Sequence, residues 1–366
     1  MKTPPPDPPI VIPPYMDQIL HSIGSRLQIT QTQFARAERA YRSVGEWLST
    51  EDSPLAPFKP EVYPQGSMAL RTTVRPLGKD EFDLDMVIEV RGWRGGAMDL
   101  YDATGDRLAA HGEYGQMLEP KNRCWRLNYA GDFHLDALPG REDRGHQGNA
   151  IQIPDRHLEE WKPTNPRDYV LWFEARSQPF YEALKERALA PLAPQEPSGR
   201  NDPLRRAVQL MKRHRDVRFD GNPDNAPRSV VLTTLAGKYY GGQESVSEAI
   251  LIILGGILSE IRAADGPILV PNPVNPDENF GDAWEGAGEG YDEFVRYIEG
   301  FRDDLLKLAR APLGKNFGEK AGALFGEDVA HRALTAYQES AGKRTEAALG
   351  RIVAGGSAPT RPWIRG

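Results

Sequence analysis

The sequence predicts an α+β protein, in which a mixed β-sheet with flanking helices is followed by a largely helical second half. Three observations support this fold class. Residues 82–90 alternate between apolar and polar positions, as a half-buried strand does. Residues 121–129 and 133–139 flank a short turn and are typical of a β-hairpin. From Leu204 onwards, apolar residues recur at three- and four-residue spacing, which indicates packed helices.

The first 50 residues predict a tail followed by two helices. Residues 1–15 are rich in proline and should be extended. Apolar residues then follow helical spacing, and Thr30 with Gln33 forms a capping box. We therefore expect one helix to end near Leu27 and a longer one to cover residues 31–48. The longer helix should pack against two lobes, one that contains the sheet and one formed by the helical second half.

The strand predicted over residues 82–90 carries two aspartates on one face, Asp83 and Asp85. Their Cβ atoms would be roughly 6–7 Å apart, so the carboxylates repel unless a cation lies between them. Asp136 lies in the second strand of the predicted hairpin and would join them if the two strands are neighbours. Three hard oxygen donors suit Mg²⁺ or Mn²⁺. Two such ions, about 3.5–4 Å apart, can activate a hydroxyl and stabilise a leaving pyrophosphate.

A Gly-Ser pair precedes the acidic strand. Gly66 and Ser67 sit in a turn that leads into a predicted helix, where backbone N–H groups and a hydroxyl can bind a triphosphate. Such a pair alone is a weak signal. Followed by an Asp-x-Asp strand and a third aspartate some fifty residues later, it indicates a metal-dependent nucleotidyltransferase site.

At these residues the sequence resembles the DNA polymerase β-like nucleotidyltransferase superfamily, and within it the bacterial relatives of cyclic GMP-AMP synthase and oligoadenylate synthase, the CD-NTases. Later stretches extend the resemblance over roughly residues 16–308. It implies a nucleotidyltransferase core plus a C-terminal helical lobe, bridged by a long N-terminal helix. The expected segments are a Pro-rich tail (1–15), bracing helices (16–50), the nucleotidyltransferase core (51–200), the helical lobe (201–350) and a flexible tail (351–366), with the crossing between lobes at 190–203.

The resemblance also implies further site residues. In this family a lysine in one helix of the second lobe and a serine at the start of the next helix hold the donor triphosphate, and Lys212 and Ser229 match them. A solvated surface charge and a helix cap are the ordinary explanations for such residues. Beside Asp83, Asp85 and Asp136 we favour the phosphate role.

The activity implied is attack of a ribose hydroxyl on the α-phosphate of a bound NTP, with purine NTPs favoured. Repetition of the step would close a cyclic di- or trinucleotide that activates a downstream antiphage effector. In some defence operons of this family, a ubiquitin-ligase-like partner joins the C-terminus to other proteins, and Gly366 would be the residue concerned.

The composition of the sequence argues against several other classes of protein. The net charge of −7 argues against an extended nucleic-acid-binding surface. A single cysteine, Cys124, excludes an internal disulfide and suits a reducing cytoplasm. The longest apolar run, residues 249–258, is too short to span a bilayer, and the N-terminus has no signal-peptide pattern. We expect a soluble, cytoplasmic protein.

Two alternatives stay open. Nucleotidyl transfer to a protein or an RNA acceptor would use the same site, and the acidic composition argues only against long RNA contacts. A nucleotide-binding module without chemistry is the other alternative, but it would have no need of three clustered carboxylates.

Overall fold

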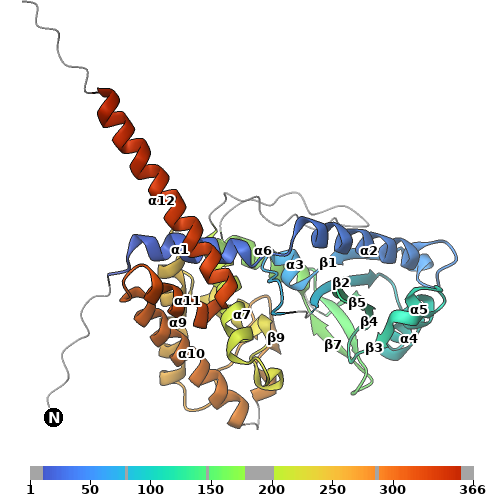
Figure 1. Cartoon of the computed structure of the whole chain (residues 1–366). Helices are drawn as coiled ribbons and strands as arrows, with labels where there is room; N and C mark the ends of the chain where they lie inside the picture. The colour runs from blue at the N-terminus through green and yellow to red at the C-terminus, as the bar shows by residue number, and fades with distance from the viewer. Residues whose placement is uncertain (1–10, 79–80, 146–147, 178–201, 285–287, 356–366) are drawn as a thin grey trace, which may run out of the picture.

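The computed structural model describes residues 11–78, 81–145, 148–177, 202–284 and 288–355, and it contains a sheet lobe and a helical lobe (Figure 1). The predicted α+β class is confirmed. The sheet lobe contains α2 (Gln31–Ser49), β1 (Glu61–Pro64), α3 (Gly66–Leu70), β2 (Phe82–Val90), α4 (Ala97–Ala109), α5 (Tyr114–Met117), β3 (Leu118–Pro120), β4 (Trp125–Tyr129), β5 (Phe133–Glu142), β6 (Ile151–Asp155) and β7 (Glu160–Thr164).

The helical lobe is formed by segments from both ends of the chain. Its elements are α1 (Pro14–Arg26), α6 (Pro166–Ser177), α7 (Pro203–Arg218), α8 (Ser229–Tyr239), α9 (Val246–Ala263), β8 (Pro271–Asn272), β9 (Asn275–Asn279), α10 (Gly288–Ala309), α11 (Lys315–Phe325) and α12 (Glu327–Gly355). In the described residues, no helix combines the length and the apolar composition needed to cross a membrane.

The main sheet is mixed. Five strands follow the order β1-β2-β5-β4-β3, and β6 pairs with both β5 and β7. Strands β2 and β5 are parallel, whereas the other pairs are antiparallel. The predicted hairpin is confirmed, with Tyr129 opposite Phe133 on either side of its turn. The parallel pair places Asp85 directly opposite Asp136.

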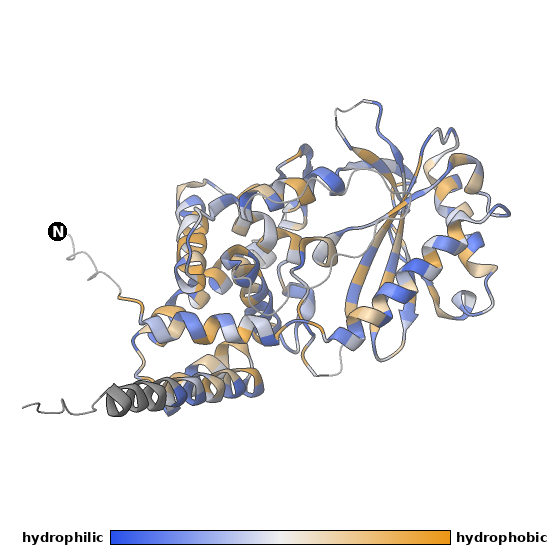
Figure 2. Cartoon of the chain, turned by 90° about the horizontal axis from the view of Figure 1, so that it is seen from above, coloured by the Kyte–Doolittle hydropathy of each residue, from blue (hydrophilic) through white to orange (hydrophobic). Residues whose placement is uncertain are grey.

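The two faces of the sheet have different surroundings. The apolar face of β2, which includes Leu84, Met86 and Ile88, is fully buried in a cluster with residues of α2 and α4. The opposite face carries Asp83 and Asp85 near the start of β2. Figure 2 shows the resulting alternation of hydrophobic and hydrophilic residues along the strands.

The capping box that was predicted for α2 is present. Thr30 Oγ1 accepts a hydrogen bond from Gln33 N at 3.1 Å, and Gln33 Oε1 accepts one from Thr30 N at 2.9 Å. The predicted packing of this helix on both lobes is not confirmed. The buried residues of α2 belong to the core of the sheet lobe, while those of α1 belong to the core of the helical lobe. Helix α1 therefore packs in the helical lobe, and helix α2 packs in the sheet lobe.

Helix α6 follows β7, the last strand of the main sheet, but packs in the helical lobe. Tyr169 and Phe173 of α6 are buried in its core, and Tyr169 shares a 2.8 Å hydrogen bond with Thr234 of α8. The predicted boundary between residues 200 and 201, most of the predicted crossing, residues 1–10 and residues 356–366, with Gly366, lie outside the described residues. Helix α12 continues to Gly355, into the segment predicted as a tail.

Residues 71–76, which we call the interlobe strap, connect α3 to the acidic strand β2 and lie against α7. The strap contains no helix or strand. Side chains of α7 donate hydrogen bonds to its backbone carbonyls, so the two lobes are joined here. The pairs are Gln209 Nε2 with Thr73 O at 3.3 Å, Lys212 Nζ with Thr72 O at 3.3 Å, and Arg213 Nη2 with Arg75 O.

Candidate active site

The three aspartates gather on one face of two parallel strands. Asp85 of β2 lies opposite Asp136 of β5, and Asp83 lies opposite His134. Because side chains two residues apart on a strand point the same way, Asp83, Asp85 and Asp136 share a face. The structure therefore brings together the carboxylates that the sequence pattern singled out.

An arginine that sequence reasoning missed joins this cluster. Arg126 of β4 lies opposite Asp136, and its guanidinium donates to both carboxylate oxygens of Asp136, at 2.7 and 2.8 Å. The same group reaches Asp83 Oδ1 at 3.2 Å. A bidentate pair of this kind fixes the orientation of the carboxylate. Arg126 also places positive charge between two acids that would otherwise repel each other.

Asp85 is close to two other carboxylates in the site. Burial, together with the carboxylates of Asp136 and Asp83, raises the pKa of Asp85 to about 8. An acid in such surroundings keeps its proton near neutral pH unless positive charge is supplied. A divalent metal ion would supply it.

The donor set fits Mg²⁺ or Mn²⁺. Within the described ranges, no group of three or more acidic, histidine or cysteine side chains is arranged so that it could hold a metal ion. Mg²⁺ is usually bound by only one or two carboxylates, together with waters and substrate phosphates. Asp83, Asp85 and Asp136 would hold the ions, with Arg126 withdrawing from Asp83. Bound there, the metal would stabilise the charge that develops during phosphoryl transfer.

Gly66 is adapted to its place beside Asp85. It begins α3 with a φ of +60°, a conformation that glycine adopts without strain. A Cβ atom at this position would overlap Asp85 Oδ2. The next residue, Ser67, shares a 3.1 Å hydrogen bond with Thr73 of the strap. Gly66 and Ser67 are thus next to the acids, where a triphosphate would need them.

Lys212 is not a surface charge. Its side chain is only 5% exposed, and its Nζ donates to Thr72 Oγ1 at 3.1 Å. Burial is the main cause that lowers the pKa of Lys212 to about 7; Arg215 lowers it further, whereas Asp216 and Asp85 act in the opposite direction. Lys212 and Asp85 are close enough for their charges to interact, so Lys212 lies near the acids.

Ser229 begins α8 but does not cap it. The N-cap is Arg228, and no side chain caps this helix end. Ser229 Oγ accepts a hydrogen bond from Arg215 Nη1, and Arg215 lies one helical turn after Lys212 on α7. The sequence places Arg215 in a basic cluster that begins at Lys212, but it gives Arg215 no role of its own, although its spacing from Lys212 could have indicated one. It contacts Ser229 directly, and its charge lowers the pKa of Lys212.

His134 is closer to the site than an ordinary strand residue. Its Nδ1 lies 3.5 Å from Asp83 Oδ1, and its Nε2 lies 2.5 Å from Glu81 Oε2. The sequence alone gives no signal for His134, because no second histidine lies at the spacing of a metal site. The parallel register alone places it beside Asp83.

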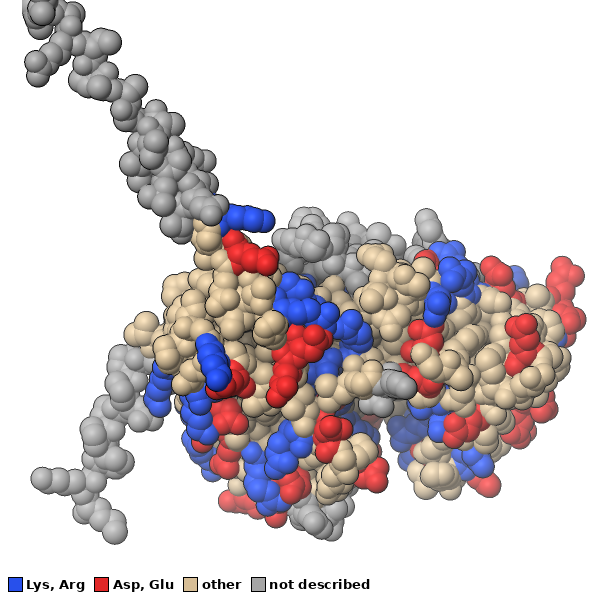
Figure 3. Space-filling view, in the orientation of Figure 1, with Lys and Arg blue, Asp and Glu red and all other residues tan. Residues whose placement is uncertain are grey.

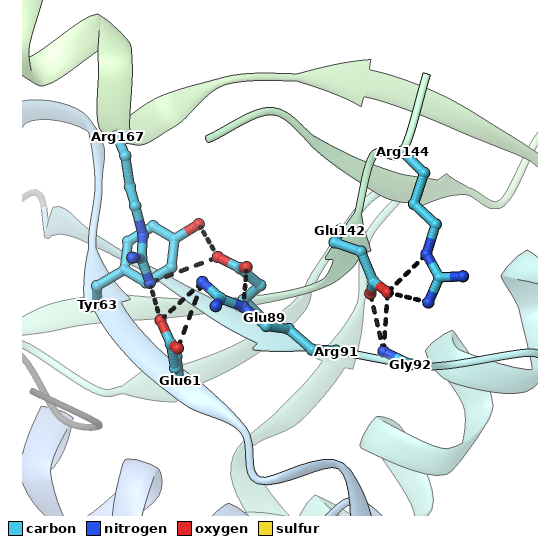
Figure 4. A network of polar contacts seen from close by, with 8 residues as sticks. All are labelled: Glu61, Tyr63, Glu89, Arg91, Gly92, Glu142, Arg144 and Arg167. Carbon is cyan, nitrogen blue, oxygen red and sulfur yellow. Dashed lines mark hydrogen bonds and ion pairs between the residues drawn. The ribbon is translucent and has the colours of Figure 1, made fainter. Parts of the chain in front are cut away.

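The far end of the catalytic face contains a polar network (Figure 4). Glu89, four residues after Asp85 on β2, is only 4% exposed. Its carboxylate accepts hydrogen bonds from Tyr63 at 3.2 Å and Arg91 at 3.1 Å, and Arg167 lies 3.4 Å away. Arg167 also packs over the Tyr63 ring and binds Glu61. These charges satisfy one another and tie the start of α6 to the sheet.

The visible surface carries both signs of charge. In Figure 3, acidic and basic side chains are interspersed over both lobes, and no long stripe of a single sign crosses that face. A continuous basic stripe is the usual electrostatic footprint of a nucleic-acid-binding surface. This face therefore does not resemble such a surface.

Comparisons with known proteins identify a family of similar sequences and structures. Residues 16–176, which include all three aspartates, match the model of the Second Messenger Oligonucleotide or Dinucleotide Synthetase domain. The chain is 33% identical over 345 residues to the c-di-GMP synthase of Roseivirga ehrenbergii, and the match covers 93% of this chain and 92% of that protein.

Two further comparisons involve one organism. The chain is 27% identical over 373 residues to the cyclic dinucleotide synthase CdnG of Bradyrhizobium diazoefficiens, which covers 93% of this chain and 87% of that protein. The solved structure of the B. diazoefficiens CD-NTase CdnG in complex with GTP superposes with a TM-score of 0.73 at 24% identity, covering 88% of this chain and 99% of that one. The folds agree over nearly the whole chain.

Proposed function

The chain belongs to the family of second messenger oligonucleotide or dinucleotide synthetases, the bacterial CD-NTases of the polymerase β-like superfamily, and we propose that it joins two molecules of GTP into cyclic di-GMP. It is a nucleotidyltransferase that makes a cyclic oligonucleotide second messenger. We choose GTP as the substrate and a cyclic dinucleotide as the product because the relative with 33% identity is a c-di-GMP synthase.

The observation that carries the proposal is the register between β2 and β5, with Asp85 opposite Asp136. That register creates a carboxylate face suited to hard divalent ions. The face continues at Gly66, Ser67 and the strap, so a triphosphate that binds there lies beside the acids.

The proposed reaction is a pair of identical transfers. A ribose hydroxyl oxygen attacks the α-phosphorus of a second GTP, an O–P bond forms, and the bond between the α-phosphorus and the bridging oxygen breaks to release pyrophosphate. The hydroxyl proton passes to the carboxylate of Asp136, which Arg126 holds in place. The linear product then turns around, and a second transfer closes the ring.

Each site residue has a proposed role. Asp83, Asp85 and Asp136 would hold Mg²⁺ or Mn²⁺, and the bound metal would activate the attacking hydroxyl and stabilise the charge that develops on the phosphate. Ser67, Lys212 and Ser229 bind the donor triphosphate, and the backbone at Gly66 allows its close approach. Arg215 orients Ser229: since the arginine occupies a lone pair of Ser229 Oγ, the hydroxyl hydrogen is available to a phosphate oxygen.

The experiment is incubation of purified protein with all four NTPs and Mg²⁺ or Mn²⁺, followed by phosphatase treatment and mass spectrometry. We expect a phosphatase-resistant cyclic di-GMP that is absent with Asp83→Asn. A product with other bases would change the substrate assignment. Label from NTPs that appears only on protein or RNA would replace cyclisation with transfer to a macromolecule, and wild-type activity in Asp83→Asn would overturn the assigned site.

The biological setting is a further part of the proposal. The family resemblance supports a role in antiphage signalling, in which the product activates a downstream effector, with a ubiquitin-ligase-like protein acting on Gly366. Expression of the chain with its genomic neighbours in a phage-challenged host tests the first point. Mass spectrometry that finds only the free C-terminus in the presence of the partner would refute the second.

A further inference from the structure

A solvent-open cavity of about 480 Å³ lies in the helical lobe, outside the candidate active site. Its walls come from α7, α10 and α11, which pack on one another (Figure 1). Cavities of this volume accommodate ligands of nucleotide size. None of the roles assigned above uses the residues that line it.

The lining of this cavity is cationic. Arg218 of α7, Lys307 of α10 and Lys320 of α11 face a single acid, Asp304. Lys307 Nζ donates to Asp304 Oδ1 at 2.6 Å, so these two charges balance. Arg218 and Lys320 form no ion pair with any residue in the described ranges. Two positive charges without a direct ion pair, of which Arg218 interacts with Glu293 at longer range, are notable at one cavity in a chain whose net charge is −7.

A buried histidine forms part of the wall. His214 is 6% exposed and stacks on Phe301, with ring centroids 3.8 Å apart and planes 10° from parallel. Its Nδ1 has no hydrogen-bond partner in the described structure. Burial lowers the pKa of His214 to about 3, so the ring is neutral at physiological pH. Buried polar atoms are normally paired. This nitrogen is shielded from solvent, so the ring would have to turn for a ligand in the cavity to pair with it.

We propose that this cavity is a second ligand site, which binds a small phosphate-bearing molecule. Arg218 and Lys320 hold the phosphate, and His214 forms a hydrogen bond with the ligand. Val217 and Leu324, which also line the cavity, provide apolar surface for a sugar or base. The proposal goes beyond the synthesis of a cyclic dinucleotide and does not depend on it.

The cavity and the candidate active site share α7. Lys212 and His214 are two positions apart, about 200° around a helix, so they face opposite sides. Lys212 binds the strap on one side, and His214 lines the cavity on the other. A ligand in the cavity thus contacts the helix that carries the donor-site cations, and it should change the KM for GTP.

The test is equilibrium dialysis of the full chain with two labelled probes, pyrophosphate and cyclic di-GMP, without divalent metal. The double variant Lys212→Met/Ser229→Ala weakens the active site as a competing binder. In that background we expect saturable binding of at least one probe, and we expect it to weaken about tenfold or more in Arg218→Glu/Lys320→Glu. The matched control, Lys315→Glu/Arg310→Glu, makes the same charge change on α11 and at the end of α10, outside the cavity, and should bind normally.

The two probes separate the possible sources of phosphate. Binding of pyrophosphate alone would identify an inorganic phosphate site, and binding of cyclic di-GMP a nucleotide site. His214→Phe keeps the ring stacked on Phe301 and should weaken binding without a charge change. Absence of saturable binding, or binding unaffected by Arg218→Glu/Lys320→Glu in a variant that melts like the wild type, overturns the proposal. Cyclic product formation is assayed separately, so failure of the proposed function would be seen independently.

Discussion

The α-carbon of Gly66 lies against the carboxylate of Asp85, so closely that a methyl group at position 66 would overlap Asp85 Oδ2. The adjacent backbone is also joined to the acid strand, because Gln65 N donates to Asp85 O at 3.0 Å. Gly66 has a φ of +60° as well. Glycine is therefore required at this position both for space and for conformation, and the start of α3 is fixed relative to the acids.

Replacement of Gly66 by alanine should displace Asp85. We expect Gly66→Ala to lower kcat/KM by about a hundredfold, since a misplacement of about 1 Å at a reacting centre has that effect. Gly112→Ala is the matched control, because nothing lies within 4 Å of a Cβ built at Gly112. Steady-state kinetics together with thermal melting measure the effect. Normal kinetics in a folded Gly66→Ala protein would contradict the proposed geometry.

Arg126 should influence metal binding. Arg126→Gln removes the bidentate contact to Asp136 and the contact to Asp83. We expect activity to fall by about 10- to 100-fold, as for the loss of other groups that orient metal ligands, and the Mg²⁺ concentration for half-maximal rate to change. Arg123→Gln serves as the control, because Arg123 binds Asp155 instead, at 3.0 Å. Equal metal dependence in both variants would contradict a role for Arg126 in metal binding.

The metal-free protein should lose stability as the pH rises. The pKa of Asp85 is raised to about 8, so between its ordinary pKa and pH 8 the folded state holds a proton that the unfolded state lacks. The free energy of unfolding therefore falls across this interval. Asp85→Asn has no such proton. In thermal melts without metal, the stability of the variant relative to the wild type should increase between pH 5 and pH 8.5. Addition of Mg²⁺ should reduce this change in relative stability. A constant difference across this pH range would show that Asp85 ionises normally.

Lys212 should bind a proton together with the nucleotide. Its pKa is lowered to about 7, so it is largely neutral at pH 8, and a triphosphate favours the charged form. Calorimetry of GTP binding at pH 8 without metal, in buffers with different ionisation enthalpies, should detect proton uptake. Lys212→Met should abolish the uptake and weaken binding about tenfold or more. Lys238→Met, which disrupts an exposed pair with Glu260, should preserve both, and uptake that persists in Lys212→Met would assign the proton elsewhere.

The polar network around Glu89 should matter for stability rather than for activity. Glu89→Gln leaves the guanidinium groups of Arg91 and Arg167 with a neutral partner, and we expect the free energy of unfolding to fall by about 1–3 kcal/mol. Urea unfolding measures this loss, and kcat should remain close to that of the wild type. Glu142→Gln, at a more exposed position, should cost less. A large loss of kcat in Glu89→Gln would indicate that the network supports the site.

Local patterns were sufficient to predict much of this fold. Alternation predicted β2, and the capping box predicted the start of α2, because both depend on residues that are close in sequence. Arg126 could also have been identified. The hairpin turn places Tyr129 opposite Phe133. Three positions further from the turn on each strand, Arg126 lies opposite Asp136.

Other features depend on contacts between distant segments. The register of Asp85 with Asp136 joins parallel strands that no tight turn connects, so the sequence offered the acids but not their alignment. Lys212 lies in a run of basic residues that would ordinarily be solvated, and only the packing of the strap against α7 buries it. The apolar stripe of α2 indicated a packed face without specifying which lobe covers it.

The interlobe strap also bears on which substitutions the protein can tolerate. Three of the contacts that hold it end on its backbone carbonyls, which every amino acid provides. Side chains should therefore be exchanged at less cost at the half-buried residues 74–76 than at Thr72 and Thr73, which are buried and whose hydroxyls bond to Lys212 and Ser67. Gln209, Lys212 and Arg213 on the facing helix supply donors that few residues could replace. A saturation library across both segments should find tolerance concentrated at residues 74–76 of the strap, and intolerance at Thr72, Thr73 and the three donor residues of the facing helix.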